Sequence, residues 1–159
     1  MDSVNFLFSA NKNAPLQNIS SVASGGEIAR VMLTIKALIA KEVKLPTIIF
    51  DEIDTGVSGE IADRMATIML EMGEANRQVI SITHLPQIAA FADNHIYIEK
   101  QSSDGRTATV LSVLSEEERV HELMRMTAGA SESAAAYENA KELLNAAKTA
   151  KCTRLCIND

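Results

Sequence analysis

Two short apolar runs constrain the fold of this chain more than any other feature. TIIFDEID at 47–54 and QVISIT at 78–83 are rich in β-branched residues, and a segment with helical spacing separates them. A strand, a crossover helix and a second strand are typical of parallel neighbours in one sheet, because a tight turn cannot join parallel strands. We therefore predict an α/β fold with a mostly parallel sheet, crossover helices and buried strands, and ligands at the carboxyl ends of those strands.

Local signals indicate the other elements. Ser24 and Glu27 have the spacing of a capping box and begin a helix that Leu45-Pro46 ends, and Ser115 and Glu118 repeat the pattern. An apolar stripe predicts the buried face of the crossover helix: Ile61, Met65, Ile68, Met69 and Met72. The remaining expectations are a strand at 4–10, a polar loop at 11–20, a short helix within 84–93, a hairpin over 95–114, helices over 116–126 and from 131, and an undefined tail at 151–159.

Composition narrows the class of protein. The 159 residues are 47% apolar and 23% charged, which is typical of one globular domain over 1–159 with its core in 4–150. No apolar run reaches the roughly 20 residues of a membrane helix, and the N-terminus does not resemble a secretory signal, so a cytoplasmic protein is expected. The net charge of -6 argues against a surface built for nucleic acid. Cys152 and Cys156 are expected to be reduced and without metal.

Polar residues at strand ends and helix starts are the candidates for chemistry. The stretch Ser24-Gly25-Gly26-Glu27 opens a helix, where free amides and glycines suit a phosphate, although an ordinary capped helix has the same pattern. Asp51 and Glu52 follow a strand and suit a Mg²⁺ ligand and a base that activates water, or alternatively a solvated turn. His84 follows the next strand and is either catalytic or structural.

Three segments in this order resemble the ABC-type ATPase family. ASGGEIAR at 23–30 resembles the signature motif, TIIFDEIDTGVSG at 47–59 the Walker B motif with its D-loop, and SITHLPQIAAFAD at 81–93 the region of the switch histidine. Within the family, the chain from about Val4 to the final helices is similar to the C-terminal half of SMC-like ATPases of bacterial DNA double-strand-break repair and recombination. The resemblance implies the C-terminal lobe of a P-loop NTPase head.

The resemblance also implies roles for the helix start. Ser24, Gly25 and Gly26 would contact the γ-phosphate of an ATP held mainly by another protomer, while Glu27 would cap the helix and support that contact. Ala23 stands where many members have leucine, which we interpret as a subfamily trait. Ser58 stands where many D-loops have aspartate, so an acidic contact across a dimer is in doubt and Ser58 would hydrogen-bond there or cap the next helix.

For the strand ends, the resemblance implies the chemistry of phosphoryl transfer. Asp51 would bind Mg²⁺, directly or through water, Glu52 would act as the general base on the attacking water, and His84 would hold the γ-phosphate and sense its loss. Positioning, metal and charge stabilisation are what this reaction requires.

The chain contains no G-x-x-x-x-G-K-[ST] loop and no long heptad stretch. In the family these belong to the N-terminal Walker A half and to a coiled coil, so we expect a C-terminal fragment that is inactive as an isolated ATPase. Its expected partners are that N-terminal half, a second protomer in an ATP-dependent head dimer, and DNA through the full-length protein, which would associate with the nucleoid.

Three alternatives stay open. One is the head of a different SMC-like protein. The coiled-coil arm and the N-terminal half, which this chain does not contain, would best distinguish the two proteins. Another is a self-contained metal-dependent hydrolase that uses Asp51, Glu52, Asp54 and His84. The third is a non-catalytic interaction module in which Met65, Met69 and Met72 serve a partner, although core packing is the more ordinary use of such a stripe.

Overall fold

A computed structural model describes residues 4–9, 12–43, 45–74, 77–103, 106–129 and 133–155 of the chain. The chain divides into two compact units, Met1–Thr83 and His84–Asp159, and each is described by itself. That 1–159 acts as one domain stays a prediction.

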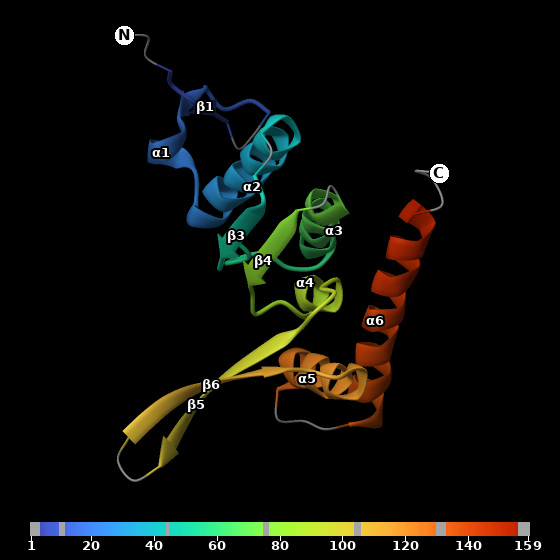
Figure 1. Cartoon of the computed structure of the whole chain (residues 1–159). Coiled ribbons are helices and arrows are strands. Elements are labelled where there is room, and N and C mark those ends of the chain that lie inside the picture. Colours follow the sequence, from blue (N-terminus) through green and yellow to red (C-terminus); the bar gives the residue numbers. More distant parts are fainter. Residues whose placement is uncertain are drawn as a thin grey trace. The chain divides into compact units, whose positions relative to one another are not determined.

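A parallel strand pair lies at the centre of the first unit. β3 (Thr47–Asp51) pairs with β4 (Gln78–Ile82) in register from Thr47 opposite Gln78 to Asp51 opposite Ile82. The crossover between them is α3 (Glu60–Glu74), which lies beside α2 (Gly25–Glu42) in Figure 1. The parallel pair with a helical crossover is therefore confirmed.

The two helices cover one face of this pair. Ile48 and Phe50 point to the covered face and are buried, and the Lys36 ammonium group of α2 lies 5.1 Å from the centre of the Phe50 ring. The methionine stripe of α3 is buried as well, which agrees with its use in core packing: Met65, Met69 and Met72.

The opposite face of the strand pair is open. Ile49 is 56% exposed, and Ile80 and Ile82 are 41% and 47% exposed. The prediction that both strands are buried is therefore wrong for this chain, because successive side chains point to opposite faces and the described elements cover one of them.

Arg77 connects the helix ends to the sheet. Its guanidinium group donates to the carbonyl oxygens of Ala40 in α2 at 2.5 Å, Met72 in α3 at 3.2 Å and Leu45 before β3 at 3.1 Å. The last carbonyl groups of a helix have no partner within the helix. One side chain thus satisfies backbone groups at the ends of α2 and α3.

The first residues differ from their prediction in two ways. β1 (Leu7–Phe8) is shorter than the predicted strand at 4–10 and pairs antiparallel with β2 (Gln17–Asn18). The predicted polar loop at 11–20 ends in β2 and in the start of α1 (Ile19–Val22), so it is wrong for its last residues. The cause is the Asn18 side chain, which accepts a hydrogen bond from the Ser20 amide and caps α1.

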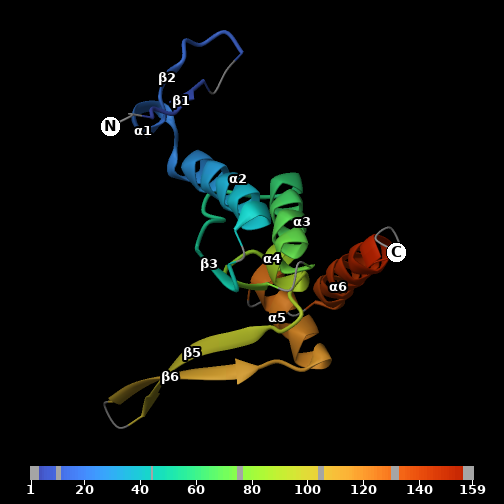
Figure 2. The ribbon, with the colours of Figure 1, turned by 45° about the horizontal axis from the view of Figure 1, so that its top comes forward.

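The second unit combines helices with a hairpin. It contains α4 (Pro86–Ala90), the antiparallel strands β5 (Ile96–Ser103) and β6 (Arg106–Val113), α5 (Glu116–Ala128) and α6 (Ala134–Leu155). Its core comes from the three helices: Ala89, Ala90, Leu123, Met124, Ala140, Leu144 and Ala147. The hairpin extends away from α5 and α6 in Figure 2. The predicted short helix, hairpin and capped helix are confirmed.

α6 extends beyond its prediction at its C-terminal end, and the predicted start at 131 lies outside the described residues. It begins at Ala134, and it continues to Leu155 through part of the predicted undefined tail. Residues 151–155, for which the sequence predicts no definite structure, are helical, and Lys151 in this turn forms an ion pair of 2.6 Å with Asp93 that ties the helix to the unit. Cys152 is an exposed free thiol, and Cys156 lies outside the described residues.

Candidate functional site

The loop that follows β3 begins with an unusual backbone conformation. Glu52 has a φ of +47°, and its amide donates to the Ile82 carbonyl at 3.0 Å, one step beyond the last strand pair. The Glu52 carbonyl in turn accepts a hydrogen bond from the Thr55 hydroxyl at 3.0 Å. A positive φ at a residue other than glycine costs of order 1–3 kcal/mol and is found most often at functional sites. The loop therefore holds Glu52 in a defined conformation at the carboxyl end of the sheet.

The side chains of this loop point to two environments. Asp51, Glu52 and Ser58 are exposed, whereas Asp54 has no exposed surface. The Asp54 carboxylate accepts a hydrogen bond from the Thr83 hydroxyl, which follows β4. The loop after β3 is thus bonded to the residue after β4, and the next residue in the chain is His84.

The start of α2 touches the same loop. A Cβ atom added to Gly26 would lie 2.9 Å from the Thr55 carbonyl oxygen and 3.4 Å from Nη1 of Arg30, while one added to Gly25 would meet nothing within 4 Å. Only glycine permits so close an approach at position 26. The structure therefore brings two of the predicted site segments together, the start of α2 and the loop after β3.

The capping box at the start of α2 is complete. The Ser24 amide and hydroxyl each donate to Glu27 at 2.8 Å, and the Glu27 amide donates back to the Ser24 hydroxyl at 3.3 Å. Hydrogen bonds from the Ser24 backbone and side chain, and then the charge of Arg30, hold the pKa of Glu27 below its usual value. Glu27 is therefore ionised and engaged in the cap, which confirms its predicted capping. The helix start leaves free amides and a partial positive charge at Gly25 and Gly26.

His84 is exposed and opens the second unit. Its predicted proximity to Asp51 and Glu52 stays a prediction, because the two units are described separately.

The residues present suit a magnesium ion held together with phosphate groups. Within the described part of the chain, no three His, Cys, Asp or Glu side chains come together to hold a metal. Asp54 is buried against Thr83, away from solvent, whereas Asp51 and Glu52 are exposed. Mg²⁺ usually binds one or two carboxylates plus substrate phosphates, and the exposed Asp51 supplies such a carboxylate.

A buried arginine in the second unit was not predicted. Arg119 is 6% exposed and donates through Nη2 to the carbonyl oxygens of Ala92 at 2.8 Å and Ala90 at 3.3 Å, which fixes the end of α4 to α5. Burial, and then the charge of Arg119, lower the pKa of His95.

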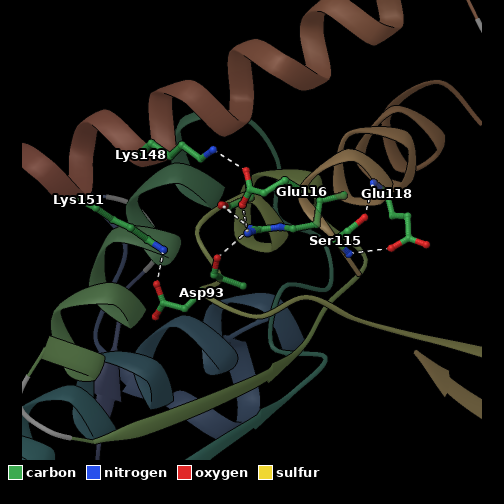
Figure 3. A network of polar contacts seen from close by, with 9 residues as sticks. Asp93, Ser115, Glu116, Glu118, Lys148 and Lys151 are labelled. Atoms are coloured by element: carbon green, nitrogen blue, oxygen red, sulfur yellow. Dashed lines mark hydrogen bonds and ion pairs between the residues drawn. The ribbon is translucent and has the colours of Figure 1, made fainter. Parts of the chain in front are cut away.

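Figure 3 shows the ion pairs of Glu116 with Lys148 and of Lys151 with Asp93. Glu116 lies between Arg119 and Lys148, at 3.4 Å and 2.5 Å, and Lys151 lies 2.6 Å from Asp93. A cavity of about 160 Å³ lies among them. Because the carboxylates are paired with these cations, the cluster joins α4, α5 and α6 rather than presenting free charge. Two basic residues of the C-terminal region, Lys148 and Lys151, therefore form ion pairs within the second unit.

The structural roles of Thr83, Arg77 and Arg119 are not evident from the sequence, and Asp54 was expected only in a metal cluster. Thr83 and Asp54 each lie shortly after a strand, and this position is the sequence signal that could have indicated their roles.

Comparison with known proteins gives a consistent result. No family model matches the chain. It is 47% identical over 153 residues to the DNA repair protein RecN of Bacillus subtilis, which is 96% of this chain and 26% of that protein. Against RecN of Vibrio cholerae it is 42% identical over 146 residues, or 92% of this chain and 26% of the relative. The chain spans about a quarter of the length of the curated relatives it matches.

Two solved structures are similar as well. One, from work on ATP-driven dimerisation and DNA-stimulated activation of SMC ATPases, has a TM-score of 0.55 and 26% identity, covering 75% of this chain and 70% of that one. The other, an SMC head bound to the C-terminal winged-helix domain of ScpA, has a TM-score of 0.51 and 31% identity, covering 65% of this chain and 30% of that one. They support an α/β fold like that of P-loop ATPases.

In the described residues, no helix is both long enough and apolar enough to cross a membrane. Over nearly its whole length, this chain is similar to part of the DNA repair protein RecN, and its fold is similar to that of SMC ATPase heads.

Proposed function

We propose that this chain supplies one side of a composite ATP site in an SMC-like head that acts in DNA double-strand-break repair. The close approach of Gly26 to the Thr55 carbonyl carries the proposal. Because of it, the open helix start at 24–27 and the acidic loop at 51–58 form one continuous surface within the first unit. Such a surface suits a composite site in which the helix start contacts the γ-phosphate of an ATP held mainly by another protomer.

Each residue then has a role that its surroundings allow. The amides of Gly25 and Gly26 bind γ-phosphate oxygens at the positive end of α2, and the Ser24 hydroxyl lies beside them. Glu52, held exposed at the strand end, takes a proton from the attacking water, and His84 donates a hydrogen bond to the γ-phosphate. Ser58 is exposed in the same loop and hydrogen-bonds across the closed interface. Asp51 holds Mg²⁺, which when bound neutralises charge on the phosphates.

The open face of the strand pair suggests where the missing part belongs. Ile49, Ile80 and Ile82 expose apolar surface on one side of a parallel pair, and parallel sheets are normally covered on both faces. We propose that the N-terminal Walker A half of the protein covers this face. A second protomer then closes on the helix start in an ATP-dependent head dimer, and DNA is bound through the full-length protein, in the bacterial cytoplasm at the nucleoid.

The test is Mg-ATP hydrolysis by this chain alone and mixed with a separately made Walker A half, each also with Glu52→Gln. We expect no turnover by the chain alone, and turnover in the mixture that Glu52→Gln abolishes. Turnover by the isolated chain that is lost in Glu52→Gln would instead mean that a complete site lies within these 159 residues.

A second test separates phosphate binding from packing. Gly26→Asp would strike the Thr55 carbonyl, whereas a side chain at Gly25 meets nothing within 4 Å. Gly25→Asp places a negative charge where the phosphate is proposed to bind, and Gly25→Asn is the neutral control of equal size. We expect the aspartate to abolish ATP-driven dimerisation of the full-length protein and the asparagine to weaken it less. Equal dimerisation of both variants would contradict phosphate binding at this helix start.

A further inference from the structure

Asp54 is unusual among the acidic residues of this chain. Of the charged residues that the structure describes, only Asp54 and Arg119 are buried, and Asp54 is 0% exposed. A buried carboxylate is unfavourable unless it is hydrogen-bonded, and an apolar residue would pack at such a position without that requirement. One of its oxygens, Oδ2, accepts a hydrogen bond from the Thr83 hydroxyl.

The bond joins two segments just beyond the end of the sheet. The last strand pair is Asp51 opposite Ile82, and the amide of Glu52 extends the pairing to the Ile82 carbonyl. Past this point the two segments leave the strand ladder. The Asp54 side chain joins the two segments here, because it comes from the turn after Glu52 and accepts a hydrogen bond from Thr83, the residue that precedes His84.

We propose that Asp54 and Thr83 form a positioning pair that couples the turn carrying Glu52 and Thr55 to the segment that enters His84. The inference rests on the proposed function, in which Glu52 and His84 act on the same γ-phosphate. Neither member of the pair touches the nucleotide. The pair fixes the backbone at residue 83, one peptide bond before the histidine, against the loop that holds the base and contacts the start of α2.

A positioning pair affects the chemical step more than nucleotide binding. Misplacing a catalytic group by about 1 Å can lower turnover about 100-fold. We therefore expect Thr83→Val, which keeps the shape and removes the hydroxyl, to lower the kcat of the full-length protein by about 10- to 100-fold, with the KM for ATP changed by less than about twofold. Thr83→Ser keeps the hydroxyl and restores kcat.

The matched control is Thr127→Val, which removes a hydroxyl that donates to the Leu123 carbonyl within α5 of the second unit. It should leave kcat unchanged. If Thr83→Val gives too little folded protein, Thr83→Cys replaces it, because a thiol is only a weak donor, and an intermediate loss of kcat is expected.

Coupling to the histidine is the decisive readout. In a protein that already carries His84→Ala, Thr83→Val should have little further effect, since residues that act as a unit are strongly non-additive. Additive losses, or an unchanged kcat in Thr83→Val, would overturn the positioning role. The Glu52→Gln variant tests the proposed function separately. If Glu52→Gln still hydrolyses ATP, the composite-site proposal is wrong. If Glu52→Gln loses ATP turnover but Thr83→Val keeps a normal kcat, only the positioning pair is wrong.

Discussion

Alanine substitutions at the two neighbouring glycines of α2 should change stability in opposite directions. The Cβ of Gly26→Ala would lie 2.9 Å from the Thr55 carbonyl oxygen, and ordinary contact begins at 3.4 Å, so the helix start and the loop must separate by about 0.5 Å. Overpacking of this kind costs about 1–3 kcal/mol, and the better helix propensity of alanine returns at most about 1 kcal/mol. With the full return, the net expectation is a loss of up to about 2 kcal/mol in the free energy of unfolding.

Gly25→Ala is the internal control, because its Cβ meets nothing within 4 Å and its φ is not positive. It should be neutral or stabilise the chain by up to about 1 kcal/mol, chiefly through the unfolded state. Urea unfolding of both variants, followed by far-ultraviolet circular dichroism, measures the difference. Equal effects at the two positions would refute the close contact between the start of α2 and the loop after β3.

Four further outcomes follow from the described contacts. Arg77→Met should lower the free energy of unfolding by about 2–3 kcal/mol, since three carbonyl groups lose a charged donor, and urea unfolding measures this. Leu123→Ala in the core of the second unit should cost about 2–5 kcal/mol in the same assay. Because burial lowers the pKa of His95 below its usual 6.5, the unfolded state binds more protons under that pH, so stability should fall as the pH drops below about 6.5 and less so in His95→Gln. Arg119→Met should raise the pKa of His95, as NMR titration can show, because it removes the second cause of the shift; an unchanged pKa would contradict their proximity.

Several elements were predictable because their signals are local. The two capping boxes, Ser24 with Glu27 and Ser115 with Glu118, require residues three positions apart and formed as expected. The hairpin over 95–114 and the crossover helix also follow from periodicity and turn residues within a short window. Placing Asp51 and Glu52 at a strand end followed from the same pattern.

Other features depend on residues far apart in the chain. The extension of α6 depends on the ion pair of Lys151 with Asp93, which lies 58 positions away. The open face at Ile49 depends on what covers the sheet, which periodicity cannot reveal.

The sequence by itself determined where the two capped helices begin, where the central strands lie, and which short segments could carry phosphate chemistry, because hydrogen bonding and side-chain alternation act over a few residues. Only the tertiary structure decided that Gly26 lies against Thr55 and that Asp54 is buried against Thr83. Those contacts join segments 29 residues apart in each case, and they exist because strand pairing and helix packing bring the strand ends and the start of α2 together.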